Sequence, residues 1–415
     1  MFKKPLRVAA ALAAVALTAA ACSSNSSSSS TTMPKYTGAN VVVGQIIPLT
    51  GAALQLTQSG DAMKAAVNYY NSQGGLQGHK LVLDQCDSQD SATVEAQCAQ
   101  KLVNDKAVAD IGGDTSFNQT AVQPTLTAAG ISRIGLLLGS VIEYTSKDNY
   151  ALEPGSILML GGMETQLVRH GCKTFNMVTV DTPSAGQLKA LLAPIATQSG
   201  GNLVNLILVP GTATDYTQYV TAAGAGNACG AAIALGSDQA NAFTAAYNQV
   251  KPSYKLSYSS GTYSSADLSK LGTAATTAVF TYGVPGGDDP KVPGLSNVMN
   301  ILKGGGSSIT ASTAQGQAII PVLAMHAFMV AASSIKGDIT AASVNSAMAA
   351  ATNIPMWGVT PPWSPGKFVP VAGPFGAVFA VISNPMLWDE QWNKTWSSNG
   401  QFNILADVPG SGVTG

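Results

Sequence analysis

A short polar stretch, Asp114 to Asn118, carries the residue types best suited to hold a small charged group. It follows an apolar run and precedes a stretch with helical spacing that begins near Gln119. Hydroxyls and backbone N–H groups at the start of a helix bind carboxylates and other anions. The predicted contacts to an anionic ligand group are Thr115, Ser116, Phe117 and Asn118. The alternative role of the hydroxyls of Thr115 and Ser116 is to cap the Gln119 helix, and one residue can do both.

Two aspartates and a tyrosine farther along the chain offer complementary chemistry. Asp181 and Asp238 each follow a predicted strand, where a carboxylate can hold a cationic group. Tyr263 lies in a third loop of this kind, and its ring is expected to close over a ligand. The alternative is that both aspartates cap the next helix and that Tyr263 packs against the connection between domains.

Several function classes are excluded by what the sequence lacks. It contains no G-x-S-x-G, no H-E-x-x-H and no P-loop, so the usual nucleophile, zinc and phosphate signatures are missing. We therefore expect no catalytic residues, no enzyme activity, no cofactor and no metal site. The net charge is -1, only 10% of residues are charged, and no run of Lys or Arg follows the N-terminal segment. This composition argues against a nucleic-acid partner.

The elements that position these residues follow a regular alternation. From residue 41 to residue 138, β-rich runs alternate with stretches of helical spacing, and a second set with the same rhythm follows from 175 to 250. The predicted strands are 41–47, 80–83, 108–111, 134–138, 175–180, 204–209 and 231–235. Such alternation predicts an α/β fold with doubly wound parallel sheets covered by helices on both faces.

The last third of the chain departs from this rhythm. A Gly-, Pro- and Asp-rich segment at 283–306 is expected to cross between domains. The apolar stretch 319–335 contains Pro321 and is too short for a membrane span, so it predicts a buried helix. Trp388, Trp392 and Trp396 recur every four residues, which predicts one stripe of a helix docked on the second domain. A carbohydrate-stacking platform is the alternative for this stripe, and 377–382 is expected to form one last strand.

The N-terminus reads as an export signal. Met1 to Ala21 has a cationic start and then a short apolar run, which is typical of a secretory signal peptide. Small residues stand directly before Cys22, as in the lipobox of bacterial lipoproteins, so lipidation at Cys22 and anchoring to the outer face of the cell membrane are expected. Ala19 stands where most lipoboxes carry Leu, which leaves cleavage by the general signal peptidase as the alternative. The serine-rich stretch up to residue 37 predicts a flexible tether.

The remaining four cysteines suit an oxidising compartment. Three pairings are possible. We favour Cys86 with Cys98 and Cys172 with Cys229, because each pair then lies within one domain. A metal site is the rival interpretation, but no C-x-x-C spacing supports it.

Two adjoining stretches resemble a known family. They read "VGQIIPLTGAALQLTQSGDAMKAAVNYYNSQGGLQGHKLVL" at 43–83 and "DQCDSQDSATVEAQCAQKLVNDKAVADIGG" at 84–113. The order of strand, P-L-T-G, helix, N-x-x-G-G-x-x-G and strand is similar to the opening of the branched-chain amino-acid type of periplasmic binding proteins. The second stretch is similar to that family's next unit, which has an Asp-rich strand end, a helix closing in K-L-V and a strand ending at Gly.

The resemblance implies a type I periplasmic binding protein fold in which two lobes joined by a three-strand hinge trap a small solute. Lobe one would comprise 38–160 and about 285–355, and lobe two 161–284 and about 356–415. The ligand would lie beyond the carboxyl ends of the strands. There the resemblance places Ser140, and Leu54 beside the first loop. It also implies a monomer that delivers its ligand to an ABC transporter permease in the membrane. A ligand-sensing lipoprotein and an extracellular enzyme are the alternatives.

The sequence departs from the family at two places near the predicted ligand. Amino-acid binders carry an acidic residue in the loop after the fourth strand of lobe two, and this chain has Gly261, Thr262 and Tyr263 there. Leu136 to Leu138 replace a polar loop, which predicts a more apolar wall. A less polar or larger solute is therefore at least as well supported as a branched-chain amino acid.

Overall fold

The computed structural model describes residues 36–51, 54–181 and 185–414. The predicted signal peptide, the lipidation site Cys22 and the serine-rich stretch up to residue 35 lie outside the described residues. No helix in the described ranges is long and apolar enough to cross a membrane.

The first sheet contains five parallel strands in the order β2-β1-β3-β4-β5. Its strands are β1 (Val41–Ile47), β2 (Leu81–Asp87), β3 (Ala109–Ile111), β4 (Ser132–Ile134) and β5 (Asn149–Tyr150). The strand predicted at 134–138 is displaced toward the N-terminus: β4 covers Ser132–Ile134, and residues 135–138 belong to the loop that leads to Ser140.

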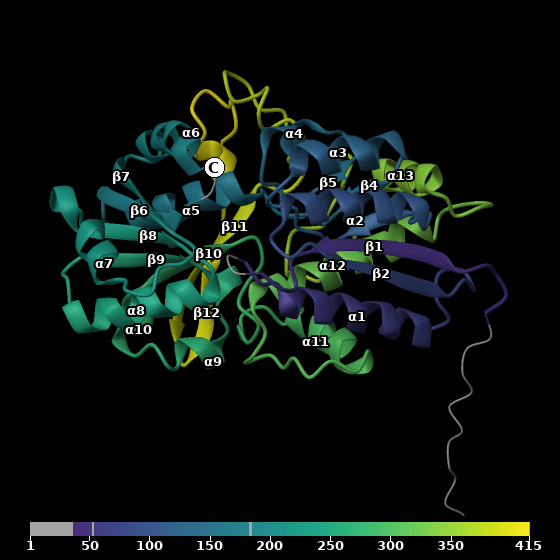
Figure 1. Cartoon of the computed structure of the whole chain (residues 1–415), viewed down its shortest axis with the longest axis horizontal. Coiled ribbons are helices and arrows are strands. Elements are labelled where there is room, and N and C mark those ends of the chain that lie inside the picture. Colours follow the sequence, from purple (N-terminus) through teal and green to yellow (C-terminus); the bar gives the residue numbers. More distant parts are fainter. Residues whose placement is uncertain (1–35, 52–53, 182–184, 415) are drawn as a thin grey trace, which may run out of the picture. The chain divides into compact units, whose positions relative to one another are not determined.

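Helices cover both faces of this sheet, as the sequence predicted (Figure 1). They are α1 (Thr57–Ser72), α2 (Ala92–Asn104), α3 (Gln119–Ala128), α4 (Val141–Thr145), α11 (Leu295–Gly304), α12 (Gly316–Ala332) and α13 (Ala341–Ala350). Helix α2 packs against α3 on one face, and α1 packs against α11 and α12 on the other. Helix α12 is apolar on all sides and almost wholly buried, which confirms the prediction of a buried helix there.

The second sheet contains seven strands in the order β12-β11-β10-β9-β8-β6-β7. They are β6 (Thr174–Val180), β7 (Asn202–Val209), β8 (Gly230–Ala234), β9 (Lys255–Ser259), β10 (Val279–Tyr282), β11 (Met386–Asn393) and β12 (Thr395–Asn403). Strands β6 to β10 are parallel, and β11 is antiparallel to both β10 and β12.

Helices and short turns complete this second unit. They are α5 (Ser156–Arg169), α6 (Ala185–Gln198), α7 (Thr217–Ala223), η1 (Ala225–Asn227), α8 (Ser237–Val250), η2 (Ser260–Thr262), α9 (Ser265–Leu268), α10 (Thr273–Thr277) and η3 (Ile404–Asp407). Helix α5 packs against β8, β9 and β10, while α7 and α8 pack together over the other face.

The tryptophan repeat does not form a helix, so that prediction is wrong. Trp388 and Trp392 lie on β11, Trp396 lies on β12, and Trp392 pairs directly with Trp396 across the hairpin. A spacing of four also places residues on one face of a strand, since side chains alternate with a period of two. The turn at Lys394, which has a φ of 69°, divides the repeat between two strands.

The strand predicted at 377–382 is also wrong. The chain forms turns there, and its one ladder contact is an isolated bridge between Ile382 and Ala151. Ile382 and Val381 are nevertheless fully buried. The apolar residues that suggested a strand therefore pack in the core but do not pair with a neighbouring strand.

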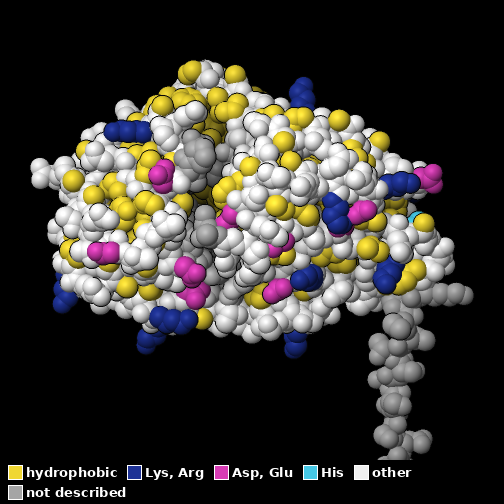
Figure 2. All heavy atoms as spheres, in the orientation of Figure 1, with side chains coloured by type: hydrophobic (Ala, Val, Ile, Leu, Met, Phe, Trp, Pro, Cys, Tyr) yellow, Lys and Arg dark blue, Asp and Glu magenta, His cyan; other side chains and the backbone are white. Residues whose placement is uncertain are grey.

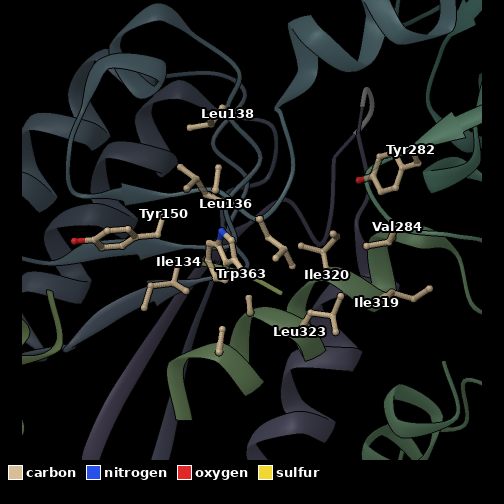
Figure 3. Packing of buried hydrophobic residues seen from close by; sticks show 14 of the residues in the cluster. Ile134, Leu136, Leu138, Tyr150, Tyr282, Val284, Ile319, Ile320, Leu323 and Trp363 are labelled. Carbon is tan, nitrogen blue, oxygen red and sulfur yellow. The ribbon is translucent and has the colours of Figure 1, made fainter. Parts of the chain in front are cut away.

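One hydrophobic cluster includes residues from both sheets. It joins Val43 of β1, Met177 of β6 and Leu323 of α12, and it includes Trp363 from the segment that leads to β11. Figure 3 shows part of this cluster, with labelled side chains from β4, β10, α12 and the Trp363 segment. The chain passes from the first set of elements to the second before α5, returns after β10, and crosses again between α13 and β11.

The favoured cysteine pairing is present. Cys86 and Cys98 form a disulfide between β2 and α2, and Cys172 and Cys229 form a second disulfide that joins the chain just before β6 to the chain just before β8. Each bridge therefore connects elements of one sheet and its helices.

Candidate functional site

The carboxyl ends of the parallel strands define where a ligand would lie. In a doubly wound sheet these ends carry the loops that approach a bound molecule. Figure 2 shows that one face of the molecule is hollowed between the two groups of elements, with hydrophobic side chains exposed in the hollow. The site is therefore built from the loops that follow β1, β3 and β4 on one side and β6, β8, β9 and β10 on the other.

The loop after β1 is held in place by two acidic side chains at the end of β2. Asp87 accepts hydrogen bonds from the backbone N–H groups of Leu49 and Thr50 and from the Thr50 hydroxyl, at 2.9, 3.1 and 2.6 Å. Burial alone would raise the pKa of Asp87, but these bonds outweigh it and lower the pKa. Asp90 accepts from the backbone N–H of Leu54 at 2.9 Å. The predicted site residue Leu54 is thereby fixed at the loop's end with its side chain half-buried.

The loop after β3 rests on a buried charged network centred on Arg133 of β4. Its guanidinium donates to Asp110 at 2.9 Å, to Glu143 at 2.6 Å and to the hydroxyl of Thr115 at 3.0 Å. The side chains of Arg133, Asp110 and Glu143 are at most 1% exposed. The two carboxylates outweigh the desolvation of the guanidinium and raise the pKa of Arg133. Arg133 therefore keeps its positive charge inside the first lobe, where it lies between these two carboxylates.

Thr115 belongs to this network. Besides accepting from Arg133, its hydroxyl donates to Glu143 at 2.8 Å, and the residue is 1% exposed. Glu143 also accepts from the backbone N–H of Gly139 at 2.8 Å and from the hydroxyl of Ser140 at 3.3 Å. The loops after β3 and β4 are thus tied to the same carboxylate, so the predicted contacts Thr115 and Ser140 act first as positioning residues.

The start of α3 already carries an internal carboxylate. Glu95 of α2 accepts from the backbone N–H groups of Phe117 and Asn118, at 3.1 Å and 2.5 Å. Burial raises the pKa of Glu95 to about 7 despite these bonds. The two N–H groups that suggested an anion site at Phe117 and Asn118 are therefore occupied by the protein itself.

The hydroxyls of this loop do not cap α3. Asn118 occupies the N-cap position, and no side-chain capping bond is formed there. The exposed Ser116 instead donates to the carboxylate of Asp114. Gly113 lets the loop pass close to the network, because a Cβ at this position would lie 2.8 Å from the carboxylate oxygens of Asp110.

The predicted contacts from the second lobe lie in contrasting environments. Asp181 is exposed at the end of β6, and its backbone N–H donates to Val209 at 2.9 Å. Asp238 is exposed in the first turn of α8. Tyr263 is only 1% exposed, and its ring packs edge-on against Tyr258 at 5.3 Å. Its environment is that of a core residue of the second lobe.

Three buried residues at the junction of the lobes were missed by the sequence analysis. Asp114 follows β3, Glu153 lies in the first crossing, and Tyr282 ends β10. Burial, with a contribution from nearby carboxylates, raises the pKa of Asp114 to about 6 and that of Glu153 to about 8. Asp114 stood within the predicted polar loop, whereas no spacing pattern marks Glu153 or Tyr282. For Arg133, the only signal was a single cation between Ser132 and Ile134 in a short run that is otherwise uncharged.

The apolar wall predicted at 136–138 is mostly interior. Leu136 and Leu138 are fully buried, and only Leu137 is half-exposed. Figure 3 shows Leu136 and Leu138 among the core side chains. In the described residues, no group of three or more His, Cys, Asp or Glu side chains gathers as a metal site would require.

Comparison with known proteins identifies the family. The model of the periplasmic binding protein family matches residues 40–370. The chain belongs to this family, and it is a binding protein, not an enzyme. No curated protein sequence matches the chain.

Solved structures share the fold at low sequence identity. An extracellular ligand-binding receptor from Verminephrobacter eiseniae is 20% identical with a TM-score of 0.64, over 75% of this chain and 90% of that one. A possible leucine/isoleucine/valine-binding protein from Rhodopirellula baltica is 14% identical with a TM-score of 0.72, over 89% and 98%. A solute-binding protein of an R. palustris ABC transporter, in complex with benzoate, is 16% identical with a TM-score of 0.70, over 91% and 98%. At these identities the likeness concerns the fold alone.

Thr115→Val tests the positioning role of the threonine. The substitution keeps the shape but leaves Glu143 and Arg133 each short of one buried hydrogen bond, which should lower the free energy of unfolding by about 1–3 kcal/mol. Urea denaturation without ligand measures this loss. The matched control is Thr120→Val at an exposed position of α3, which should change stability by less than about 0.5 kcal/mol. Equal stability of the two variants would contradict the positioning role.

The buried acids make the unliganded protein less stable at alkaline pH. Raised pKa values are found for Glu95, Asp114, Glu153, Glu164, Glu390 and Asp407. The folded state binds these protons more tightly than the unfolded state does. The stability they provide is complete below the usual acid pKa values and is lost as pH rises through about 6 to about 8. The lowered pKa of His326 acts in the opposite sense, but it is a single group.

We therefore expect the thermal midpoint of the unliganded protein to fall between pH 5.5 and pH 8. Glu153→Gln should flatten the upper part of this decline, because the pKa of Glu153 is about 8. Differential scanning calorimetry at constant ionic strength measures both. A midpoint that rises over this range would contradict the account.

Proposed function

We propose that this chain is an extracytoplasmic receptor that traps a small solute between two lobes and delivers it to the permease of an ABC transporter. The observation that carries the proposal is the family match over 40–370, which spans both sheets and two of the three crossings. The arrangement of the strand ends supports it, since loops from both sheets border the hollow face in Figure 2.

The lobes that we propose are 38–160 with about 285–355, and 161–284 with about 356–415. Three observations support this division. Helix α11 packs against α1, helix α13 packs against β3 and β4, and the β11–β12 hairpin extends the second sheet. The chain would therefore cross between lobes three times, which suits a hinge that opens and closes around a ligand.

Contacts near the start of α1 support a closing motion. Gln58 of α1 donates to the carbonyl of Thr313 at 3.1 Å and accepts from the backbone N–H of Gln315 at 3.1 Å. On the other side, the side chain of Gln315 donates to Asp267 of α9 at 3.3 Å, and the N–H of Ala266 donates to Ser312 at 2.9 Å. The segment 312–315 thus bonds to one helix of each lobe, and these bonds can form only while the lobes are close.

The ligand that we propose is an amino acid or a less polar solute of similar size. Solved structures of this fold include one in complex with isoleucine and others in complex with benzoate and 4-hydroxybenzoate. The hollow that binds such molecules in this chain would combine hydrophobic side chains with the polar loops after β3 and β4.

We also propose that the protein is a lipoprotein, made with a signal peptide and anchored at Cys22. Two arguments support the anchor. Four of the five cysteines form the two disulfides, which leaves Cys22 over. An anchored receptor would also remain near its permease.

A thermal-shift screen tests the transport proposal. The purified protein is heated with members of a broad solute library that covers amino acids, amides, aromatic acids, sugars and short peptides. A solute at 100 times its dissociation constant should add about 2.7 kcal/mol of stability. No shift from any class would contradict the proposal, and chemical conversion of a bound solute would favour the enzyme alternative.

Cys22→Ser tests the anchor. The native chain expressed in a host that processes lipoproteins should fractionate with membranes, whereas the variant should not be lipidated and should leave the membrane fraction. Mass spectrometry of the mature N-terminus identifies the lipid. A native chain that is released after cleavage and carries no lipid at Cys22 would overturn this part of the proposal.

A further inference from the structure

Two buried carboxyl groups at the lobe junction each have one oxygen without a partner among the described residues. Asp114 is 4% exposed and Glu153 is 2% exposed. One oxygen of each, Oδ2 of Asp114 and Oε2 of Glu153, is buried without a hydrogen-bond partner among the described residues. A buried polar atom that remains unpaired costs about 1–3 kcal/mol, and more when it is charged. A bound group that donates hydrogen bonds to these two oxygens would remove this cost.

The two acids come from different parts of the fold, and Glu153 lies against Tyr282. Asp114 follows β3 of the first sheet, whereas Glu153 lies in the first crossing between lobes. The hydroxyl of Tyr282, at the end of β10, donates to Oε1 of Glu153 at 3.4 Å. Gly283 allows Glu153 to lie close, because a Cβ there would be 2.5 Å from the Cβ of Glu153.

No protein cation balances this pair. Arg133 is the one buried Lys or Arg side chain in the described part of the chain, and its bonds go to Asp110, Glu143, Thr115 and Gln123. Although Arg133 lowers the pKa of Asp114, burial and the negative charge of Glu143 raise it, and the charge of Asp114 in turn raises the pKa of Glu153. The charge of Asp114 is thus felt at Glu153.

Three other buried glutamates differ from this pair. Glu95 and Glu390 both accept bonds from backbone N–H groups, so their oxygens have protein partners. Glu164 is fully buried with both oxygens unpartnered, but it lies in the middle of α5, away from the strand ends. Of these buried acids, Asp114 and Glu153 are the two that combine an unpaired oxygen with a position in the chain just after a strand of the first sheet.

We propose that Asp114 and Glu153 together bind a cationic nitrogen of the solute, such as an ammonium or amidinium group. This inference rests on the proposed receptor function and narrows its ligand to solutes that carry such a group. The unpaired oxygens would accept the N–H bonds of the cation, with the ring of Tyr282 beside them. Amino-acid binders of the family carry an acidic residue where this chain has Gly261 to Tyr263. Asp114 and Glu153 would take over its role, although they lie in the first lobe and in the first crossing between lobes.

Matched probes with and without the cation test the inference. The pairs are benzylamine against benzoate, and leucine against 4-methylpentanoate, which lacks the amino group. Isothermal titration and thermal shifts measure binding to the purified protein. We expect at least one amine-bearing probe to bind, at least tenfold more tightly than the acid that lacks the amine.

Isosteric variants link this preference to the two residues. Asp114→Asn and Glu153→Gln should each weaken binding of the amine at least tenfold. At pH 9, above the raised pKa values of both acids, each variant should also raise the thermal midpoint of the unliganded protein, because it removes an uncompensated buried charge. Glu164→Gln is the matched control: it removes a similarly unpaired buried carboxyl and should leave amine binding unchanged.

The outcomes separate the inference from the receptor proposal. Failure of every amine-bearing probe to bind overturns the inference, as does unchanged amine binding in Asp114→Asn and Glu153→Gln. A lower unliganded midpoint in these two variants would mean that the carboxyls have internal partners, which also contradicts it. If an acidic or neutral solute from the broad library binds while no amine does, the receptor proposal stands without the inference. If no solute of any class binds, both fall.

Discussion

The single buried arginine of the first lobe is the interaction on which the ligand-binding edge depends. Arg133 brings together Asp110 of β3, Thr115 in the loop after β3 and Glu143 in the helix after β4. Breaking a buried pair by removing one partner costs about 3–5 kcal/mol, because the remaining charge is left uncompensated. The network therefore fixes two adjacent loops in one geometry, and a ligand meets a surface that is already organised.

The same network explains why other charges at the lobe junction remain unpaired. The guanidinium is bonded to its own carboxylates, so among the described residues no cation forms a hydrogen bond or ion pair with Asp114 or Glu153. Buried acids of this kind destabilise the unliganded fold. Functional sites often retain such unfavourable groups. A ligand that pairs with them removes their energetic cost, and this gain adds to its binding energy. On this account, the acids that weaken the empty receptor are the ones that select its solute.

The sequence allowed the fold to be predicted well where the pattern was local. The stretch 43–113 contains strand, helix and glycine signals in a family-specific order, and the expectation that each cysteine pair lies within one domain led to both disulfides. The family match and both sheets confirm the architecture. The tryptophan hairpin was missed because a spacing of four fits a helix and a strand equally, and only pairing with β10 decides between them.

The site was harder to predict because its chemistry depends on distant partners. The sequence marked Thr115 as a polar group at a strand end, but it did not show that Arg133 and Glu143 occupy its hydroxyl. Nor did it show that Glu95, more than twenty residues earlier, occupies the N–H groups of Phe117 and Asn118. Glu153 carries no local signal, since its role arises from the crossing between lobes.

The most direct measurement is a crystal structure of the protein with a bound amine-bearing solute. The account predicts that the cationic nitrogen lies within hydrogen-bond distance of Asp114 and Glu153, while Arg133 remains bonded to Asp110 and Glu143. A structure in which Arg133 leaves these partners to bind a carboxylate of the solute, with Asp114 and Glu153 turned away from it, would contradict the account.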